Sequence, residues 1–168
     1  MADLDGIFKA YDVRGLVPDQ LDEPLVERIG ASYARFLIGG TEGEVAPSRV
    51  LVGRDMRPSG PGFVAAFARG VTSQGLDVVD LGLCSTDEVY FASGSMDAPA
   101  AMFTASHNPA GYNGIKFCRS GARPLGLDSG LDRVRDDARA DLEPMGEPGL
   151  VTTADVLEQF VDLSLIHI

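Results

Sequence analysis

The sequence predicts an α/β fold in which a mostly parallel mixed sheet is flanked by helices. Short apolar runs, each the length of a buried strand, alternate along the chain with longer segments whose apolar residues recur at helical spacing. The composition, 45% hydrophobic and 23% charged, supplies an apolar core and differs from that of a disordered chain. With 168 residues, the chain has the length of one ordinary domain.

The first elements follow from local signals. Residues 4–17 are expected to form an extended segment. A helix then begins after Asp22, which suits the N-cap, with Pro24 in the first turn, and Gly39 and Gly40 end it. The apolar side chains that recur at helical spacing within it are Leu25, Ile29, Tyr33 and Phe36.

A strand–helix–strand unit comes next. The apolar run 50–52 predicts a buried strand, residues 60–75 an amphipathic helix, and residues 78–81 the following strand. This unit is the building block of a parallel sheet. A further helix is predicted over 86–93, and it leads to another buried strand over 100–103.

The remaining elements are shorter or more polar. A strand is predicted over 114–118, after the turn 111–113. A helix is predicted over 129–142, with its many charged side chains in solvent. Residues 152–162 are predicted to begin one more helix.

The net charge and the cysteine content limit the functions that the protein can have. The net charge of −11 at pH 7 repels nucleic acid, and no basic face is present to bind an anionic membrane. The two cysteines, Cys84 and Cys118, are expected to be reduced thiols. No signal peptide is visible, and no apolar run approaches the ~20 residues that span a membrane. We therefore expect a soluble cytoplasmic protein without nucleic-acid or membrane partners.

The segment from Thr104 to Pro109 is the most informative one for chemistry. It follows a buried strand, at the sheet edge where open α/β sheets bind ligands. Ser106 could act there as a nucleophile or phosphate carrier, and Asn108 before Pro109 favours a turn. The residues alone leave open an ordinary turn with solvent-facing side chains at Ser106 and His107. The nucleophile-elbow G-x-S-x-G, the Walker A loop and the Rossmann glycine fingerprint G-x-G-x-x-G are absent from the sequence.

Four motifs occur in order along the chain. They are F-K-A-Y-D-V-R-G at 8–15, V-G-R-D-M-R-P-S-G at 52–60, T-A-S-H-N-P at 104–109 and Y-N-G-I-K-F at 112–117. Together they resemble the motifs of the α-D-phosphohexomutase family, of the phosphomannomutase/phosphoglucomutase kind. The resemblance covers about residues 4–160. It implies that residues 1–150 are the family's N-terminal α/β domain, and that residues 151–162 begin the helix leading to a second domain.

The resemblance also implies a reaction. Members of the family interconvert hexose 1-phosphate and hexose 6-phosphate, here of mannose and/or glucose, through a phosphoserine and a hexose 1,6-bisphosphate intermediate, with Mg²⁺ as the metal ion. Ser106 would carry the phosphoryl group and offer one of its oxygens to the metal. The residues expected to be catalytic are Ser106, His107, Lys116 and Arg14. The residues expected to bind the substrate or its phosphate are Tyr11, Arg14, Asn108 and Lys116.

Each type of side chain suits its implied role. Arg14 can neutralise phosphoryl charge through two parallel hydrogen bonds, and His107 can transfer protons near neutral pH. Lys116 stands between two apolar residues of a strand, so it is expected on the face opposite the core. Tyr11 either packs or orders the site by hydrogen bonding. Arg54 with Asp55 favours a structural ion pair.

Other loops of the family are missing from this sequence. It contains neither the metal loop D-G-D-x-D-R, nor the sugar loop G-E-x-S-G-H, nor the phosphate loop R-x-S-x-T-E-P. We therefore expect a truncated, inactive piece of a mutase, whose partners are its own missing domains and the hexose phosphate. Residues 163–168 resemble a translated transposon end and are expected to be non-native, which leaves His167 without a function. Two alternatives stay open: a phosphoglucosamine mutase domain, and a stand-alone, non-catalytic module that binds a phosphorylated ligand.

Overall fold

The computed structural model describes residues 3–40 and 45–165. The strands within these ranges are β1 (Val13–Leu16), β2 (Arg49–Arg54), β3 (Asp77–Leu83), β4 (Ala100–Phe103), β5 (Tyr112–Arg119), β6 (Arg123–Pro124) and β7 (Val151–Thr153). They form one sheet in the order β1-β5-β4-β2-β3-β7, with β6 paired to β5. The neighbours β4, β2, β3 and β7 run parallel, whereas β5 is antiparallel to β4, β1 and β6.

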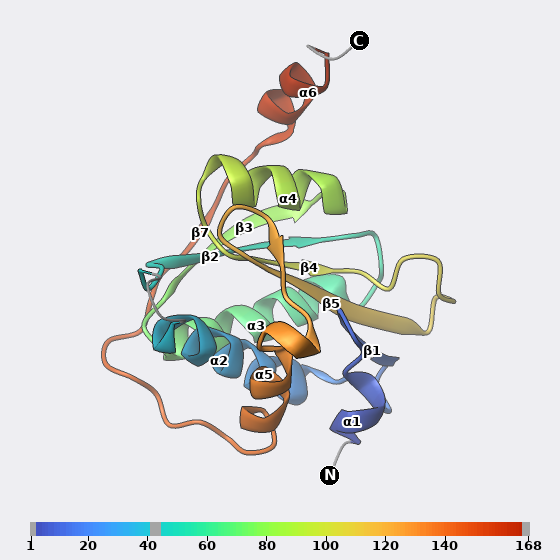
Figure 1. Ribbon diagram of the computed structural model, residues 1–168. Coiled ribbons are helices and arrows are strands. Elements are labelled where there is room, and N and C mark those ends of the chain that lie inside the picture. The colour runs from blue at the N-terminus through green and yellow to red at the C-terminus, as the bar shows by residue number, and fades with distance from the viewer. Residues whose placement is uncertain (1–2, 41–44, 166–168) are drawn as a thin grey trace.

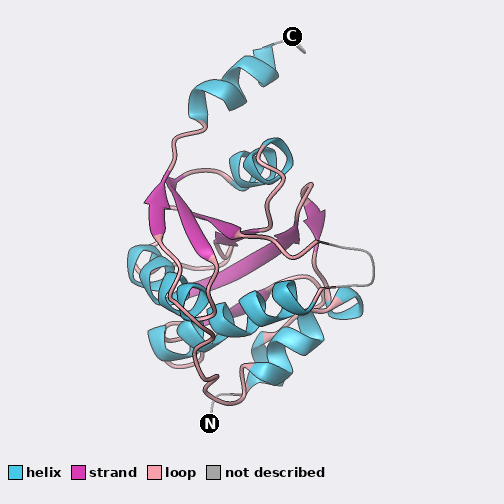
Figure 2. Cartoon of the chain, turned by 90° about the vertical axis from the view of Figure 1, so that its left-hand side faces the viewer, coloured by secondary structure: helices cyan, strands magenta, loops and turns pink. Residues whose placement is uncertain are grey.

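Helices cover both faces of this sheet. They are α1 (Leu4–Ile7), α2 (Glu23–Gly39), α3 (Gly60–Ser73), α4 (Thr86–Ser95), α5 (Leu131–Asp137) and α6 (Leu157–Leu165), with a 3₁₀ turn, η1, at Leu127–Ser129. The helices α2, α3 and α5 lie on one side and α4 on the other, while α6 projects beyond α4 (Figure 1). Figure 2 shows the same layers edge on, with strands between helices. The predicted α/β class, a mixed sheet flanked by helices, is confirmed.

The larger core lies between the sheet and the helices α2 and α3. Tyr33 and Phe67 from these helices pack on Phe103 and Phe117 of the sheet, with ring centres 4.7–6.2 Å apart. Burial of such apolar surface is the main force that holds the layers together. The two helices approach closely at Gly70, where a Cβ atom would lie only 2.0 Å from a backbone oxygen of α2. A smaller core fills the space beneath α4.

Three predicted elements need correction. In the segment 4–17, residues Leu4–Ile7 form the short helix α1, because the Asp3 side chain accepts the Gly6 N–H and caps it. The helix predicted over 129–142 is limited to α5. The carbonyl of Ala138, just after α5, instead accepts a hydrogen bond from Arg28 of α2 at 3.2 Å. A tertiary contact thus replaces the continued helix.

The helix predicted over residues 152–162 begins later than expected. Residues 151–153 are not the start of a helix but the edge strand β7, which pairs with β3 through Val78, Val79 and Asp80. The helix α6 begins only at Leu157, whose N–H bonds to the Asp155 carboxylate at 2.9 Å. The division of the chain near residue 150 stays a prediction. Of the expected tail, 166–168 with His167 lie outside the described residues.

Candidate functional site

Two loops meet at the carboxyl edge of the sheet. Arg54 at the end of β2 pairs in register with Phe103 at the end of β4, so the loops that follow these strands lie side by side. The backbone N–H of Asp55 donates to the Phe103 carbonyl at 2.9 Å and joins them. The two loops line an open depression of about 290 Å³. Its lining residues are Met56, Arg57, Pro58, Ser106, His107, Asn108 and Ala110.

Ser106 is presented to solvent from a constrained turn. Its backbone has φ of 51°, the left-handed region that residues other than glycine rarely adopt. Its N–H donates to the Thr104 hydroxyl at 2.9 Å, and the Asn108 amide nitrogen donates to the Ala105 carbonyl at 2.9 Å. The Ser106 hydroxyl oxygen lies 3.4 Å from Nδ1 of the exposed His107. An exposed hydroxyl therefore stands beside an imidazole at the sheet edge.

The guanidinium of Arg57 holds this turn from beneath. It is only 8% exposed and donates hydrogen bonds to four carbonyl oxygens. These oxygens belong to Ser106, Asn108, Pro109 and Tyr112. The Asp55 carboxylate, 3.4 Å from Nε of Arg57, balances the buried charge.

The expected ion pair of Arg54 with Asp55 is therefore wrong, because Asp55 pairs with Arg57. The reason is local geometry. Arg54 is the last residue of β2, whereas the Asp55 carboxylate also accepts the N–H of Arg57 at 3.0 Å. That bond folds the chain back and brings the side chains of Asp55 and Arg57 together.

Arg14 and Lys116 share one buried carboxylate. The Asp12 side chain accepts a hydrogen bond from Arg14 at 2.6 Å and lies 3.6 Å from the Lys116 nitrogen. The pairing of Val13 with Ile115 explains this, because continuing the register places Asp12 opposite Lys116. Since Ile115 belongs to the core beneath α2 and α3, alternation places Lys116 on the other face, as expected.

The predicted residues thus form two groups. One group is the turn with Ser106 and His107, and the other is the pair of cations around Asp12. Across residues 3–40 and 45–165, no hydrogen bond or ion pair joins Ser106 to Arg14 or Lys116. The groups are neighbours through β5, since Thr104 donates to the Gly114 carbonyl at 3.0 Å. Their convergence on a single phosphoryl group stays a prediction.

Tyr11 and Asn108 differ in their availability to a ligand. The Tyr11 side chain is 68% exposed, and its hydroxyl makes no hydrogen bond to the described residues. In this structure it is therefore neither a core residue nor a hydrogen-bonding support of the site. Asn108, in contrast, uses its amide nitrogen inside the turn, so its first task is to shape the loop.

The described residues do not form a metal site by themselves. Within them, no group of three or more His, Cys, Asp or Glu side chains is arranged to hold an ion. Mg²⁺ requires near-octahedral oxygen coordination, and the single phosphate oxygen expected on Ser106 cannot supply it. Likewise, no described helix is both long and apolar enough to cross a membrane.

The cysteines are free thiols and poor nucleophiles. Burial raises the pKa of Cys84 from 9.0 to about 11, and the nearby Glu88 carboxylate adds to this rise. Burial likewise raises the pKa of Cys118. Both thiols are therefore protonated near neutral pH. Since the nucleophilic form of cysteine is the thiolate, neither side chain is suited to act as a nucleophile there.

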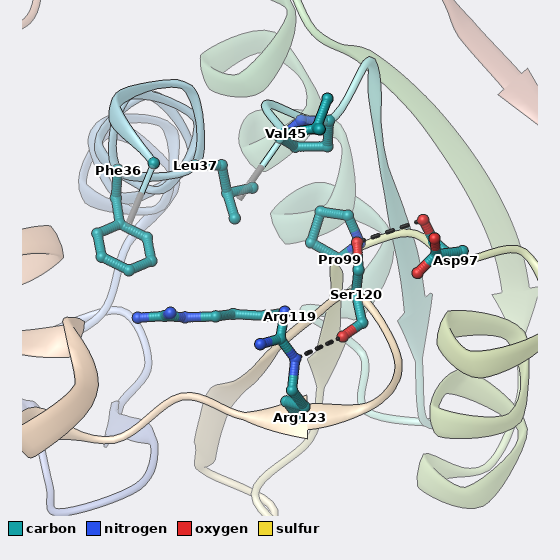
Figure 3. Close-up of a pocket in the computed structure, with 10 residues that line it drawn as sticks. Phe36, Leu37, Val45, Asp97, Pro99, Arg119, Ser120 and Arg123 are labelled. Carbon is teal, nitrogen blue, oxygen red and sulfur yellow. Dashed lines mark hydrogen bonds between the residues drawn. The ribbon is translucent and has the colours of Figure 1, made fainter. Parts of the chain in front are cut away.

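A second cavity, of about 270 Å³, lies at the opposite edge of the sheet, where β4 begins and β5 ends (Figure 3). The cationic side chains that line this cavity contact other residues of the domain. The guanidinium of Arg119 lies 5.1 Å from the ring centre of Phe36, and Nε of Arg123 donates to the Ser120 carbonyl at 3.0 Å. None of the predicted site residues lines this cavity.

Sequence reasoning missed the two residues that organise the site, Arg57 and Asp12. Both lie inside the motifs, but neither was assigned a role. The available signal was a charged residue inside a predicted extended segment or in the loop after a predicted buried strand, because a charge that is buried there needs a partner. The partners themselves could not be read from the sequence, since Arg57 bonds to residues 49–55 positions away.

Comparison with known proteins identifies the family to which the chain belongs. Residues 5–141 match the family described as phosphoglucomutase/phosphomannomutase, alpha/beta/alpha domain I. A Xanthomonas campestris protein named phosphohexose mutases is 44% identical over 142 residues, which cover 84% of this chain and 30% of that protein. A Klebsiella pneumoniae phosphomannomutase is 37% identical over 159 residues, which cover 92% of this chain and 96% of that protein.

Comparison with solved structures gives the same family as comparison with sequences. A crystal structure of a phosphoglucomutase/phosphomannomutase family protein from Burkholderia thailandensis superposes with a TM-score of 0.74 at 33% identity. The match covers 96% of this chain and 35% of that one. The chain thus spans about a third of the length of the Xanthomonas and Burkholderia proteins. It belongs to the phosphoglucomutase/phosphomannomutase family and contains that family's α/β/α domain I.

Proposed function

We propose that this chain supplies the phosphoryl-carrying site of a phosphohexomutase that interconverts the 1- and 6-phosphates of mannose and/or glucose. The observation that carries the proposal is the geometry of Ser106. Its hydroxyl is exposed on a hydrogen-bonded turn at the carboxyl edge of the sheet, 3.4 Å from the His107 imidazole. The names of the Xanthomonas and Klebsiella relatives support the reaction class.

In the proposed reaction, Ser106 exchanges a phosphoryl group with the sugar. In the transfer from a hexose 1,6-bisphosphate, the Ser106 oxygen forms a bond to phosphorus while the bond from phosphorus to a sugar oxygen breaks. The serine proton passes through His107 to the leaving sugar oxygen. The return transfer reverses these steps at the other sugar oxygen. Catalysis of this kind depends mainly on positioning and charge neutralisation.

The charge neutralisation would come from Arg14 and Lys116. Both already stand beside Asp12, so an arriving phosphate group would share them with that carboxylate. Exposed Tyr11 would contact the sugar or its phosphate, and Asn108 would keep the turn in shape. Mg²⁺, when bound, would supply further positive charge through the phosphate on Ser106, with its other ligands from beyond the described residues. We place the protein in the cytoplasm and regard the remaining domains of a full-length mutase as its partners.

A chimera tests this proposal. Residues 5–141 would replace the corresponding part of the Xanthomonas relative, and conversion of mannose 1-phosphate to mannose 6-phosphate would be measured with Mg²⁺ and mannose 1,6-bisphosphate. We expect the chimera to turn over and Ser106→Ala to abolish turnover. The matched control is Ser120→Ala, at the opposite edge of the sheet, which should remain active. Equal activity of the Ser106→Ala chimera and its parent would refute the role of Ser106.

A further inference from the structure

We infer that Arg57 is the positioning residue of the Ser106 turn, holding the backbone so that only the serine side chain is free to react. The effect of Arg57 on catalysis rests on the proposed function, whereas its effect on the conformation of the turn does not. We assign Arg57 no contact with substrate.

The two terminal nitrogens of Arg57 bind different parts of the turn. Nη2 donates to the carbonyl oxygens of Ser106 at 2.8 Å and Asn108 at 2.9 Å. Nη1 donates to those of Pro109 at 2.9 Å and Tyr112 at 2.7 Å. One planar cation therefore draws together both ends of the segment 106–112. Bonds from a charged donor are stronger than neutral ones, which makes this fork a rigid support.

Burial excludes a direct catalytic role for this side chain. Arg57 is 8% exposed, and Asp55 and the four carbonyls already surround its guanidinium. A buried cation is retained only when such partners compensate for its lost hydration. Arg57 also lines the depression, but its terminal nitrogens are already bonded to the four carbonyls, so a substrate phosphate there would meet the exposed Ser106 and His107 of the turn.

The conformation of Ser106 explains why the turn needs support. With φ of 51°, the residue occupies a region that is unfavourable for an L-amino acid other than glycine. Both of its backbone polar groups are held, the N–H by the Thr104 hydroxyl at 2.9 Å and the carbonyl by Arg57 at 2.8 Å. Fixing the backbone on both sides leaves the hydroxyl as the only group of Ser106 that can reach outward. Arg57 supplies one of these two restraints.

Hydrogen exchange of the full chain tests the effect of Arg57 on the conformation of the turn. Arg57→Lys keeps the charge beside Asp55 but replaces the planar fork by a single ammonium group. We expect amide exchange within residues 104–112 to accelerate about tenfold or more, with β2, β3 and β4 unchanged. The control is Arg69→Lys, in an exposed pair with Glu27, which should alter neither region. Uniform acceleration across the domain, or none in the turn, would overturn the inference.

Two further measurements separate positioning from simple stability. If the turn of Arg57→Ala loses its protection, added guanidinium ion at a concentration that leaves the fold intact should restore it, and sodium chloride of equal ionic strength should not. In the mutase chimera, Arg57→Lys should lower kcat about tenfold or more while KM stays within about twofold, since Arg57 touches no substrate. Unchanged kcat would contradict the inference. An inactive parent chimera would count against the proposed function alone, and the exchange result would still decide the role of Arg57.

Discussion

The ammonium nitrogen of Lys116 lies 3.6 Å from a carboxylate oxygen of Asp12. The same oxygen accepts a 2.6 Å bond from Arg14, and Asp12 as a whole is only 8% exposed. One nearly buried carboxylate thus holds both cations that we propose for phosphate binding. The arrangement keeps their charges in place on the sheet when no phosphate is near.

Removing the Asp12 charge should therefore destabilise the fold. We expect Asp12→Asn to lower the free energy of unfolding by about 1–3 kcal/mol, less than for a fully buried pair because both cations are partly exposed. Urea titration measures the change. The matched control is Asp136→Asn, which removes a carboxylate that also contacts two arginines but lies exposed on α5, and it should cost less than about 1 kcal/mol. Equal losses in the two variants would contradict the assigned burial.

The backbone of Ser106 makes a second prediction. Because its φ is 51°, Ser106→Gly should be more stable than Ser106→Ala by about 1 kcal/mol, since glycine has no steric penalty in this region. Thermal unfolding of both variants measures the difference. Ala122, with φ of 57° far from the site, provides a parallel case, and Ala122→Gly should also raise stability. A Ser106→Gly protein less stable than Ser106→Ala would show that the turn has another conformation.

The Cys84 thiol predicts a pH dependence. Burial raises its pKa from 9.0 to about 11, so the folded chain holds the thiol protonated more firmly than the unfolded chain does. The stability that this contributes is present below pH 9.0 and is lost as the pH rises through about 11. The difference in unfolding free energy between the parent and Cys84→Ala should therefore shrink over this window, as measured by urea titration at several pH values. A difference that does not change with pH would rule out the raised pKa.

Much of the fold could be predicted because it depends on local patterns. The strands 50–52, 78–81 and 100–103 and the helices between them follow from apolar spacing. Each lies within an observed element, except that the helix predicted over 60–75 ends earlier, at Ser73. The strand β7 could not be found in this way. Its three residues are exposed and become a strand only because the edge of β3 is free to pair with them.

In the site, too, residues within a motif could be predicted, whereas contacts between distant parts of the chain could not. Motif resemblance pointed to Ser106, His107 and Lys116, which are exposed or partly exposed. Arg57, in contrast, acts through bonds to carbonyls in another loop, and its partners are backbone atoms that no residue pattern specifies. Buried polar supports of this kind depend on the complete fold.

The 168-residue chain by itself should show no mutase turnover. The described residues contain no metal-holding cluster, and the sequence lacks the metal and sugar loops of the family. Loss of this positioning and electrostatic stabilisation typically costs several kcal/mol of barrier for each group. The assay is conversion of glucose 1-phosphate to glucose 6-phosphate with Mg²⁺ and a bisphosphate activator, beside a Ser106→Ala control. Turnover that Ser106→Ala abolishes would prove that one domain suffices.

The central claim is that Ser106 carries the phosphoryl group, and the most direct measurement locates that group. The mutase chimera would be mixed with hexose 1,6-bisphosphate carrying labelled phosphate, quenched, and digested so that mass spectrometry identifies the modified residue. The account predicts label on Ser106, and its transfer to sugar when unlabelled hexose 6-phosphate is added. A chimera that turns over while its label resides on His107, or on any residue other than Ser106, would contradict the account.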